Sequence, residues 1–123
     1  MAKTFSQFPV SLAHAQNNQK ILVTLVDETD VLTLETGVSS PTLQISKNGS
    51  SYASLSDGTW AEIGQGDYTV RLDDTDTNTL GWAVLRIIKS GTTAETKILV
   101  YISVSMAEQR QSYQRQRIAY RRE

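Results

Sequence analysis

Apolar and polar residues alternate along most of this chain, in short runs broken by glycine, asparagine, aspartate or serine. Alternation with a period of two is typical of strands that bury one face, and the breaks are typical of turns. The run at 67–73 is the clearest, with Tyr68, Val70 and Leu72 on one face. The pattern predicts strands at 20–26, 31–34, 42–47, 50–54, 60–63, 67–73, 82–89 and 96–104.

The turns between these runs favour antiparallel neighbours. Asn48-Gly49 separates the runs at 42–47 and 50–54. It predicts a two-residue hairpin, because both central residues of a type I′ turn need positive φ. Short strands joined by such turns are typical of sheets packed face to face. The sequence therefore predicts an all-β chain, with an antiparallel β-sandwich over residues 20–105.

A polar N-terminal arm at 1–19 precedes the predicted sandwich. Pro9 excludes a helix interior in this segment, and a free arm would rarely keep two rings such as Phe5 and Phe8. Two explanations stay open. The rings dock on their own sandwich, or they reach a neighbouring subunit. Phe5 and Phe8 are predicted to be docking anchors in either case.

The C-terminal segment 106–123 follows a helical pattern instead. Ser105 and Glu108 fit a capping box at its start. The segment carries five arginines against two glutamates, while the rest of the chain has an acidic excess, so an acidic partner is expected. A lone helix of this length is only marginally stable in water. Docking on a protein is preferred over a solvated face or a nucleic acid. The predicted contacts are Met106, Arg110, Tyr113, Arg117, Tyr120 and Arg121.

The predicted strand at 82–89 is apolar on both faces, which is unusual for a strand at the surface. Ala83, Leu85 and Ile87 share one face. A strand face in water is normally polar, so the opposite face is predicted to be a covered interface. A neighbouring subunit would cover it, or the arm or helix of the same chain would. The residues of that interface face are Trp82, Val84, Arg86 and Ile88.

The chain offers little for catalysis or metal binding. It has no cysteine and a single histidine, His14. The run 74–78 resembles the first half of a calcium loop, but Thr79 and Leu85 stand where that loop needs glycine and glutamate. Capping and turn formation are the expected roles of this run. We expect no metal, no cofactor and no enzymatic activity.

Length and hydropathy indicate one soluble domain. A chain of 123 residues can bury a core without disulfides. No apolar run approaches the ~20 residues of a membrane helix, and the N-terminus lacks the apolar centre of a secretory signal. The protein is therefore expected to be made and folded in a cytoplasm.

An ordered set of motifs between Val23 and Ser103 resembles a module of tailed-bacteriophage structural proteins. The set comprises a Val-Asp-x-Thr-Asp segment, a Glu-Thr-Gly turn, an Ile-Ser-Lys-Asn-Gly hairpin, a Glu-Ile-Gly-x-Gly-x-Tyr strand and an Asp-Thr-Asn-Thr-Leu-Gly crossover. Their order and spacing are kept over about two-thirds of the chain. The motifs lie at 26–30, 35–37, 45–49, 62–68 and 76–81.

The resemblance implies an immunoglobulin-like β-sandwich in a protein of the virion. Such modules occur in head decoration proteins, head fibres, collar proteins and tail or baseplate proteins, and they are not enzymes. Their motifs are structural, so the resemblance supplies no catalytic residues. The arm at 1–19 and the helix at 106–123 lie outside it, and these extensions are expected to choose the docking site.

The preferred function is therefore a capsid decoration or cement protein that docks on the major capsid protein. The alternatives are a neck, collar or tail protein on a connector or tail ring, and a surface adhesin that binds carbohydrate. Trp60 and Trp82 are the candidates for sugar stacking, although core packing explains them better. The expected location is the virion, assembled in the host cytoplasm. A homo-oligomer is expected, with no membrane contact.

Overall fold

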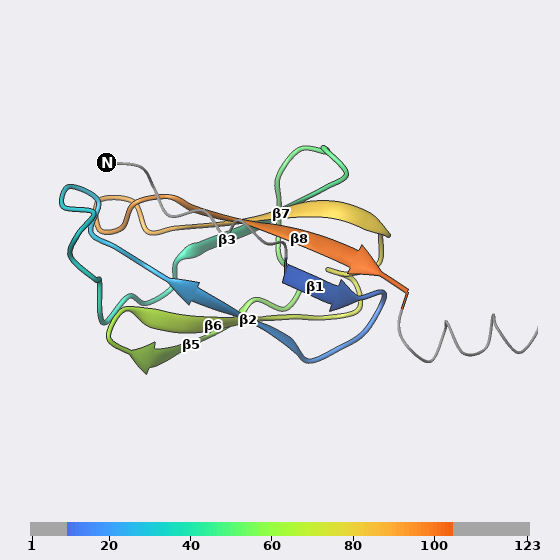
Figure 1. The fold of residues 1–123 in the computed structure, drawn as a ribbon, viewed down its shortest axis with the longest axis horizontal. Helices are drawn as coiled ribbons and strands as arrows, with labels where there is room; N and C mark the ends of the chain where they lie inside the picture. Colours follow the sequence, from blue (N-terminus) through green and yellow to red (C-terminus); the bar gives the residue numbers. More distant parts are fainter. Residues whose placement is uncertain (1–9, 105–123) are drawn as a thin grey trace, which may run out of the picture.

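The computed structural model describes residues 10–104, which form two β-sheets packed face to face (Figure 1). Within these residues every regular element is a strand, as the alternating pattern predicts. The strands are β1 (Val10–Ala13), β2 (Gln19–Thr24), β3 (Thr42–Lys47), β4 (Ala53–Ser54), β5 (Thr59–Gly64), β6 (Asp67–Leu72), β7 (Gly81–Ile88) and β8 (Thr96–Ser103).

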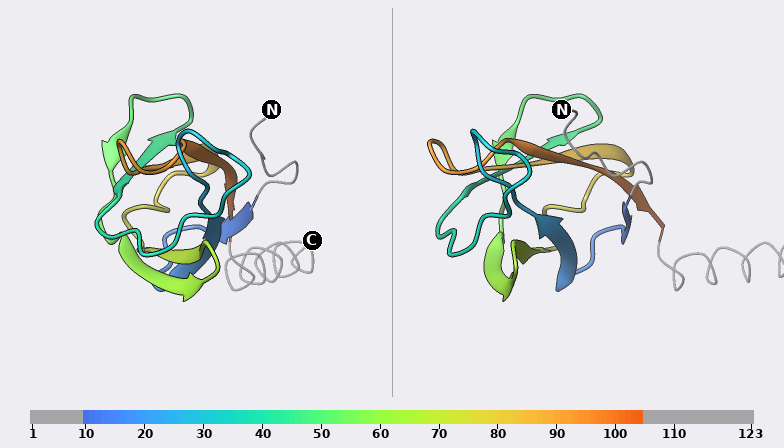
Figure 2. Two further views of the ribbon diagram at one scale, coloured as in Figure 1. Left: turned by 90° about the vertical axis from the view of Figure 1, so that its left-hand side faces the viewer. Right: turned by 60° about the vertical axis from the view of Figure 1, so that its left-hand side comes forward.

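The two sheets differ in size. Figure 2 shows them in two further views. One sheet has the order β1-β8-β7-β3-β4, and the other has the order β2-β6-β5. All pairs are antiparallel except β1 with β8, which is parallel. This strand order resembles that of immunoglobulin-like sandwiches, in which each sheet combines strands from both halves of the chain.

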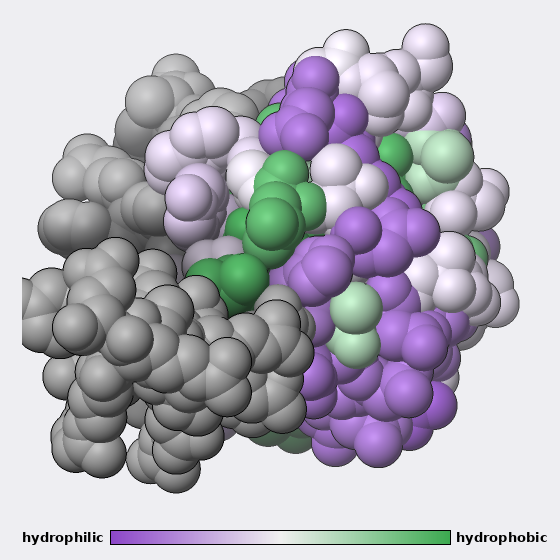
Figure 3. All heavy atoms as spheres, turned by 90° about the vertical axis from the view of Figure 1, so that its right-hand side faces the viewer, coloured by the Kyte–Doolittle hydropathy of each residue, from purple (hydrophilic) through white to green (hydrophobic). Residues whose placement is uncertain are grey.

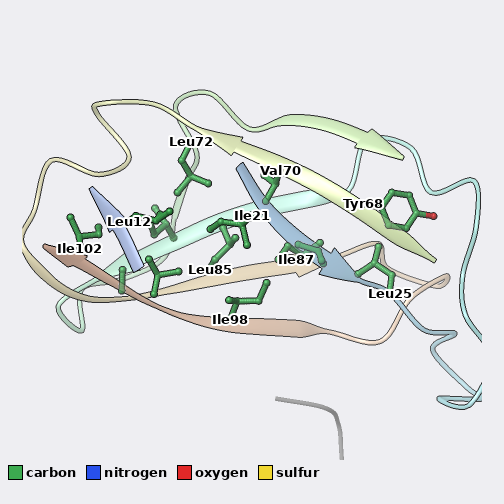
Figure 4. Close-up of a cluster of buried hydrophobic side chains, with 14 of the residues drawn as sticks. Leu12, Ile21, Leu25, Tyr68, Val70, Leu72, Leu85, Ile87, Ile98 and Ile102 are labelled. Carbon is green, nitrogen blue, oxygen red and sulfur yellow. The ribbon is translucent and has the colours of Figure 1, made fainter. Parts of the chain in front are cut away.

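The core lies between the sheets and comes from alternate positions of the strands (Figure 4). Ala83, Leu85 and Ile87 of β7 are buried, as predicted from their shared face. Tyr68, Val70 and Leu72 of β6 are fully buried opposite them. The period-two pattern was informative because each strand has one face on this core.

The predicted boundary between arm and sandwich at residue 19 is wrong. Val10–Ala13 is strand β1, which pairs with β8 in the register Val10↔Val100 to Ala13↔Ser103. Leu12 is buried in the core. Four residues are too few for a periodic signal, and parallel pairing with the distant β8 leaves no local turn signal.

Two of the predicted strands are reduced in the structure. The run 31–34 is a turn organised by Asp30, with one isolated bridge, Val26↔Leu34. The Asp30 carboxylate accepts hydrogen bonds from the Leu32 amide and the Thr33 hydroxyl. The predicted strand at 50–54 is reduced to β4, two residues long.

Both predicted docking extensions fall largely outside the described residues. The C-terminal helix and residues 1–9 of the arm therefore stay predictions. So do the contacts proposed for them, namely Phe5, Phe8, Met106, Arg110, Tyr113, Arg117, Tyr120 and Arg121. Among the residues that the structure does describe, there is no helix that could cross a membrane.

Candidate functional site

The acidic run near residue 76 stabilises a turn. Asp73 caps it, since its Oδ1 accepts the amide of Asp76 at 2.9 Å and Asp76 Oδ2 accepts the amide of Asp73 at 3.2 Å. This is the reciprocal arrangement of a capping box. Asp76 is buried and also accepts the amides of Ser56 and Asp57, at 2.7 and 3.2 Å. The turn-forming role expected for the run 74–78 is confirmed through Asp76, but the cap itself is Asp73, one residue before that run.

Three carboxyls whose pKa values are lowered also serve the scaffold. Arg71 Nε donates to Asp57 Oδ2 at 2.7 Å, and this bond holds the pKa of Asp57 below its ordinary value. A hydrogen bond from the Ser56 hydroxyl lowers the pKa of Asp73. The backbone amide of Asp30 does the same for Asp27. These groups are fixed in turns, and no metal-binding cluster of acidic or histidine side chains occurs within residues 10–104.

The most distinctive surface feature lies on the outer face of the five-stranded sheet. Trp82 and Val84 of β7 point away from the core, as predicted, and the Trp82 side chain is 50% exposed. Register places Trp82 beside Tyr101 and Val84 beside Leu99 of β8. These four residues form one block, which we call the outer patch.

The two aromatic rings of the outer patch lie together. The centroids of Trp82 and Tyr101 are 4.7 Å apart and their planes meet at 60°. Such tilted pairs are favourable arrangements of aromatic rings. Tyr101 and Leu99 remain 39% and 36% exposed. The patch is therefore a pre-formed apolar surface with a wide aromatic contact area.

Arg86 and Ile88, the other two predicted interface residues, lie beyond the outer patch. Arg86 forms an ion pair with Glu95, and its Nη1 donates to Gln44 Oε1 at 2.7 Å. Its guanidinium also lies 5.9 Å from the ring centre of Tyr52. Arg86 is therefore held by its own sheet and forms a polar border. Ile88, opposite Thr42, is half-buried.

Hydrophobic residues also reach the end of the sandwich at which β8 finishes. Figure 3 shows that end, where a narrow band of hydrophobic residues runs between hydrophilic ones. Exposed Leu80 precedes β7, and exposed Val104 follows β8. The apolar character of the outer sheet thus continues to the point at which residues 105–123 begin.

The two tryptophans have different environments. Trp60 stacks on Tyr68 with centroids 4.7 Å apart, and its Nε1 donates to the Val38 carbonyl at 2.9 Å. Core packing therefore explains Trp60. Trp82 has an exposed ring and remains available for an external contact.

Sequence reasoning did not single out Leu99 and Tyr101, although a signal existed. The run 96–104 is apolar on both faces, as is 82–89. The same argument that identified Trp82 could have identified Leu99 and Tyr101. Only the β7–β8 register shows that they adjoin Trp82 and Val84.

Comparison with known proteins adds little to this picture. No protein-family profile and no curated protein sequence matches the chain. A crystal structure of the titin M3 domain is similar over 79% of this chain and 93% of that chain, at 14% identity and a TM-score of 0.35. Similarity at that level carries no argument about function. The immunoglobulin-like character of the fold is shown by the strand order of the two sheets.

Proposed function

We propose that this chain is a non-enzymatic structural protein of a tailed-phage virion, attached to the particle partly through the outer patch. The observation that carries the proposal is the block of Trp82, Val84, Leu99 and Tyr101 on the outer face of the five-stranded sheet. Monomeric surfaces rarely expose contiguous apolar groups without a partner. The sequence motifs shared with phage modules supply the virion context.

The mechanism of attachment is burial of aromatic and aliphatic surface. Trp and Tyr are enriched among residues that dominate binding energy, because they bury a large area with few rotatable bonds. The ion-paired Arg86 would lie at the polar rim of such a contact. Repeated copies on one particle would multiply a modest contact into a large stabilisation.

The preferred binding partner is the major capsid protein, which would make this chain a decoration or cement protein. A connector or a tail ring is the alternative. Copies per particle distinguish the two, because a shell offers hundreds of equivalent sites and a ring offers about a dozen. Quantitative mass spectrometry of purified virions would measure this number.

The direct test is binding of the purified protein to particles that lack it. Trp82→Ala and Tyr101→Ala should each weaken binding by about tenfold or more, as expected for residues at the centre of an interface. Ile63→Ala is the matched control, since Ile63 is exposed on the other sheet. Unchanged binding of both aromatic variants would exclude the outer patch as the contact.

A carbohydrate-binding adhesin is the second candidate, and the exposed ring of Trp82 beside Tyr101 favours it. Sugar rings pack on exposed aromatic faces, which Trp60 cannot offer because it is stacked on Tyr68. A glycan array with the intact chain and with Trp82→Ala separates the candidates. Glycan binding lost in Trp82→Ala, with particle binding kept, supports the adhesin.

A further inference from the structure

The turn after β3 contains a candidate site of spontaneous deamidation. The chain has four asparagines, and Asn48 alone precedes a glycine. Deamidation begins when the next backbone nitrogen attacks the side-chain carbonyl carbon of asparagine, and glycine has no side chain to hinder that approach. Asn48, Gly49 and Ser50 are all exposed to water. Sequence and exposure together therefore single out Asn48 for this reaction.

The backbone nitrogen that would attack is accessible in this turn. The Ser50 amide donates to the Lys47 carbonyl at 3.0 Å, which closes the turn. The Gly49 amide inside the turn donates no hydrogen bond to any residue from 10 to 104. The φ angles of Asn48 and Gly49, 49° and 79°, fit a type I′ turn. Because Gly49 is exposed, hydroxide can reach its N–H and remove the proton.

The side chain that would be attacked is held against the start of β7. Asn48 Nδ2 donates to the Leu80 carbonyl at 3.0 Å, and the backbone amide of Asn48 donates to the Trp82 carbonyl at 2.8 Å. A Cβ on Gly81 would lie only 2.6 Å from Asn48 Oδ1, so the side chain packs directly on this glycine. The reaction expels Nδ2 and so cannot proceed without loss of the bond to Leu80. Deamidation should therefore be slower in the folded chain than in the unfolded one.

We propose that Asn48 is a site of spontaneous deamidation, and that the reaction detaches the turn from residues 80–82. The Gly49 nitrogen loses its proton and forms a bond to Asn48 Cγ, and the Cγ–Nδ2 bond breaks to release ammonia. Water then opens the resulting succinimide ring at either carbonyl, which gives aspartate or isoaspartate. Water is the only co-reactant.

Either product changes the contacts of the turn. A carboxylate has no N–H to donate to the Leu80 carbonyl, and it places a negative charge beside that oxygen. Isoaspartate also adds a carbon to the main chain, next to the amide that bonds Trp82. Since Trp82 belongs to the outer patch, the modification alters one end of that surface. The inference concerns the chain itself and stands independently of the virion function.

The first test incubates the full chain in mildly alkaline buffer and follows each asparagine by mass spectrometry of proteolytic peptides. Asn48 should be converted, and more slowly in the folded chain than in urea. Gly49→Ala should slow the conversion by about tenfold, which corresponds to about 1.4 kcal/mol in the activation barrier, because its methyl group hinders the attack. An unchanged Asn48 would overturn the proposed site. Equal rates in the folded and unfolded chain would overturn the restraint by Leu80.

The second test measures the consequence with Asn48→Asp, one of the two products. This variant should lower the urea midpoint of unfolding by about 0.5 M, because a donor is replaced by a group that cannot donate. The matched control is Asn18→Asp, since Asn18 is exposed, has φ of 60° and undergoes the same change of charge. Its midpoint should be nearly unchanged. The NMR signal of the Trp82 indole N–H should shift in Asn48→Asp alone. Equal midpoints and an unshifted indole signal would overturn the proposed detachment.

Discussion

The carboxylate of Asp76 is the polar group on which most of the local structure depends. It is 2% exposed and accepts three backbone N–H donors, from Ser56, Asp57 and Asp73. Those donors belong to two loops at one end of the sandwich. A buried donor without a partner costs free energy, so the carboxylate stabilises both loops together.

Asp76→Ala should therefore destabilise the fold by about 3 kcal/mol, because it leaves several backbone donors unpaired. Asp74→Ala is the control, since Asp74 is exposed in the same turn and its variant should lie within about 0.5 kcal/mol of the parent chain. Urea unfolding measures both. A loss of similar size at Asp74 would contradict this account of the turn.

At the scale of elements, the β5–β6 hairpin shows how a short turn positions a neighbouring loop. Gly66 has φ of +86°, and its carbonyl accepts the Leu25 amide at 2.9 Å. A Cβ on Gly66 would lie 2.8 Å from the Leu34 Cβ. The glycine thus allows the loop that carries Leu34 to lie directly on the hairpin.

Gly66→Ala should lower the free energy of unfolding by about 3 kcal/mol, because it strains the backbone and displaces the loop. Gly49→Ala is the matched comparison, since Gly49 has φ of +79° and a Cβ added there would have no atom within 4 Å. That variant should lose only about 1 kcal/mol of stability, because backbone strain is its one penalty. Thermal unfolding of the two variants checks the difference. Equal losses would mean that contact with Leu34 is unimportant.

Elements that are long, or whose signal lies within a few neighbouring residues, could be predicted from the sequence. The Asn48-Gly49 turn is confirmed, with φ of 49° and 79°, because its signal is contained in two residues. The strand after it pairs with β3 only at Ala53 and Ser54. β7 and β6 were predictable from long alternating runs. β1 was missed because it is four residues long and its partner residues in β8, such as Val100 for Val10, lie ninety positions later in the chain. The run 31–34 was over-predicted because its alternation belongs to a turn held by Asp30.

At the scale of the whole molecule, the charged groups serve mainly to join the loops of the sandwich. Arg71 of β6 bonds Asp57 in the turn before β5, and Asp73 accepts the Ser56 hydroxyl at 2.6 Å. These bonds lower the pKa of Asp57 and of Asp73 below the ordinary value of 3.8. Folding therefore favours the ionised form of both carboxyls.

The sign of the resulting pH dependence follows from linkage. The contribution of a carboxyl with a lowered pKa is complete above its unfolded pKa and is lost as the pH falls through the folded one. Stability should thus be constant near neutral pH and decrease below about pH 4. Urea titrations at several pH values measure this, and Asp57→Asn should show a shallower decrease than Asp74→Asn. Identical slopes would show that the Asp57–Arg71 pair does not contribute.

The sequence by itself determined most of the strands and the buried faces of β6 and β7, because alternation and turn residues are local properties. It also marked Trp82 and Val84 as apolar residues on an outer face. The tertiary structure decided which strands are neighbours, because a local pattern of residues does not specify the pairing of distant strands. That pairing joins β1 to β8 and places Leu99 and Tyr101 beside Trp82 and Val84.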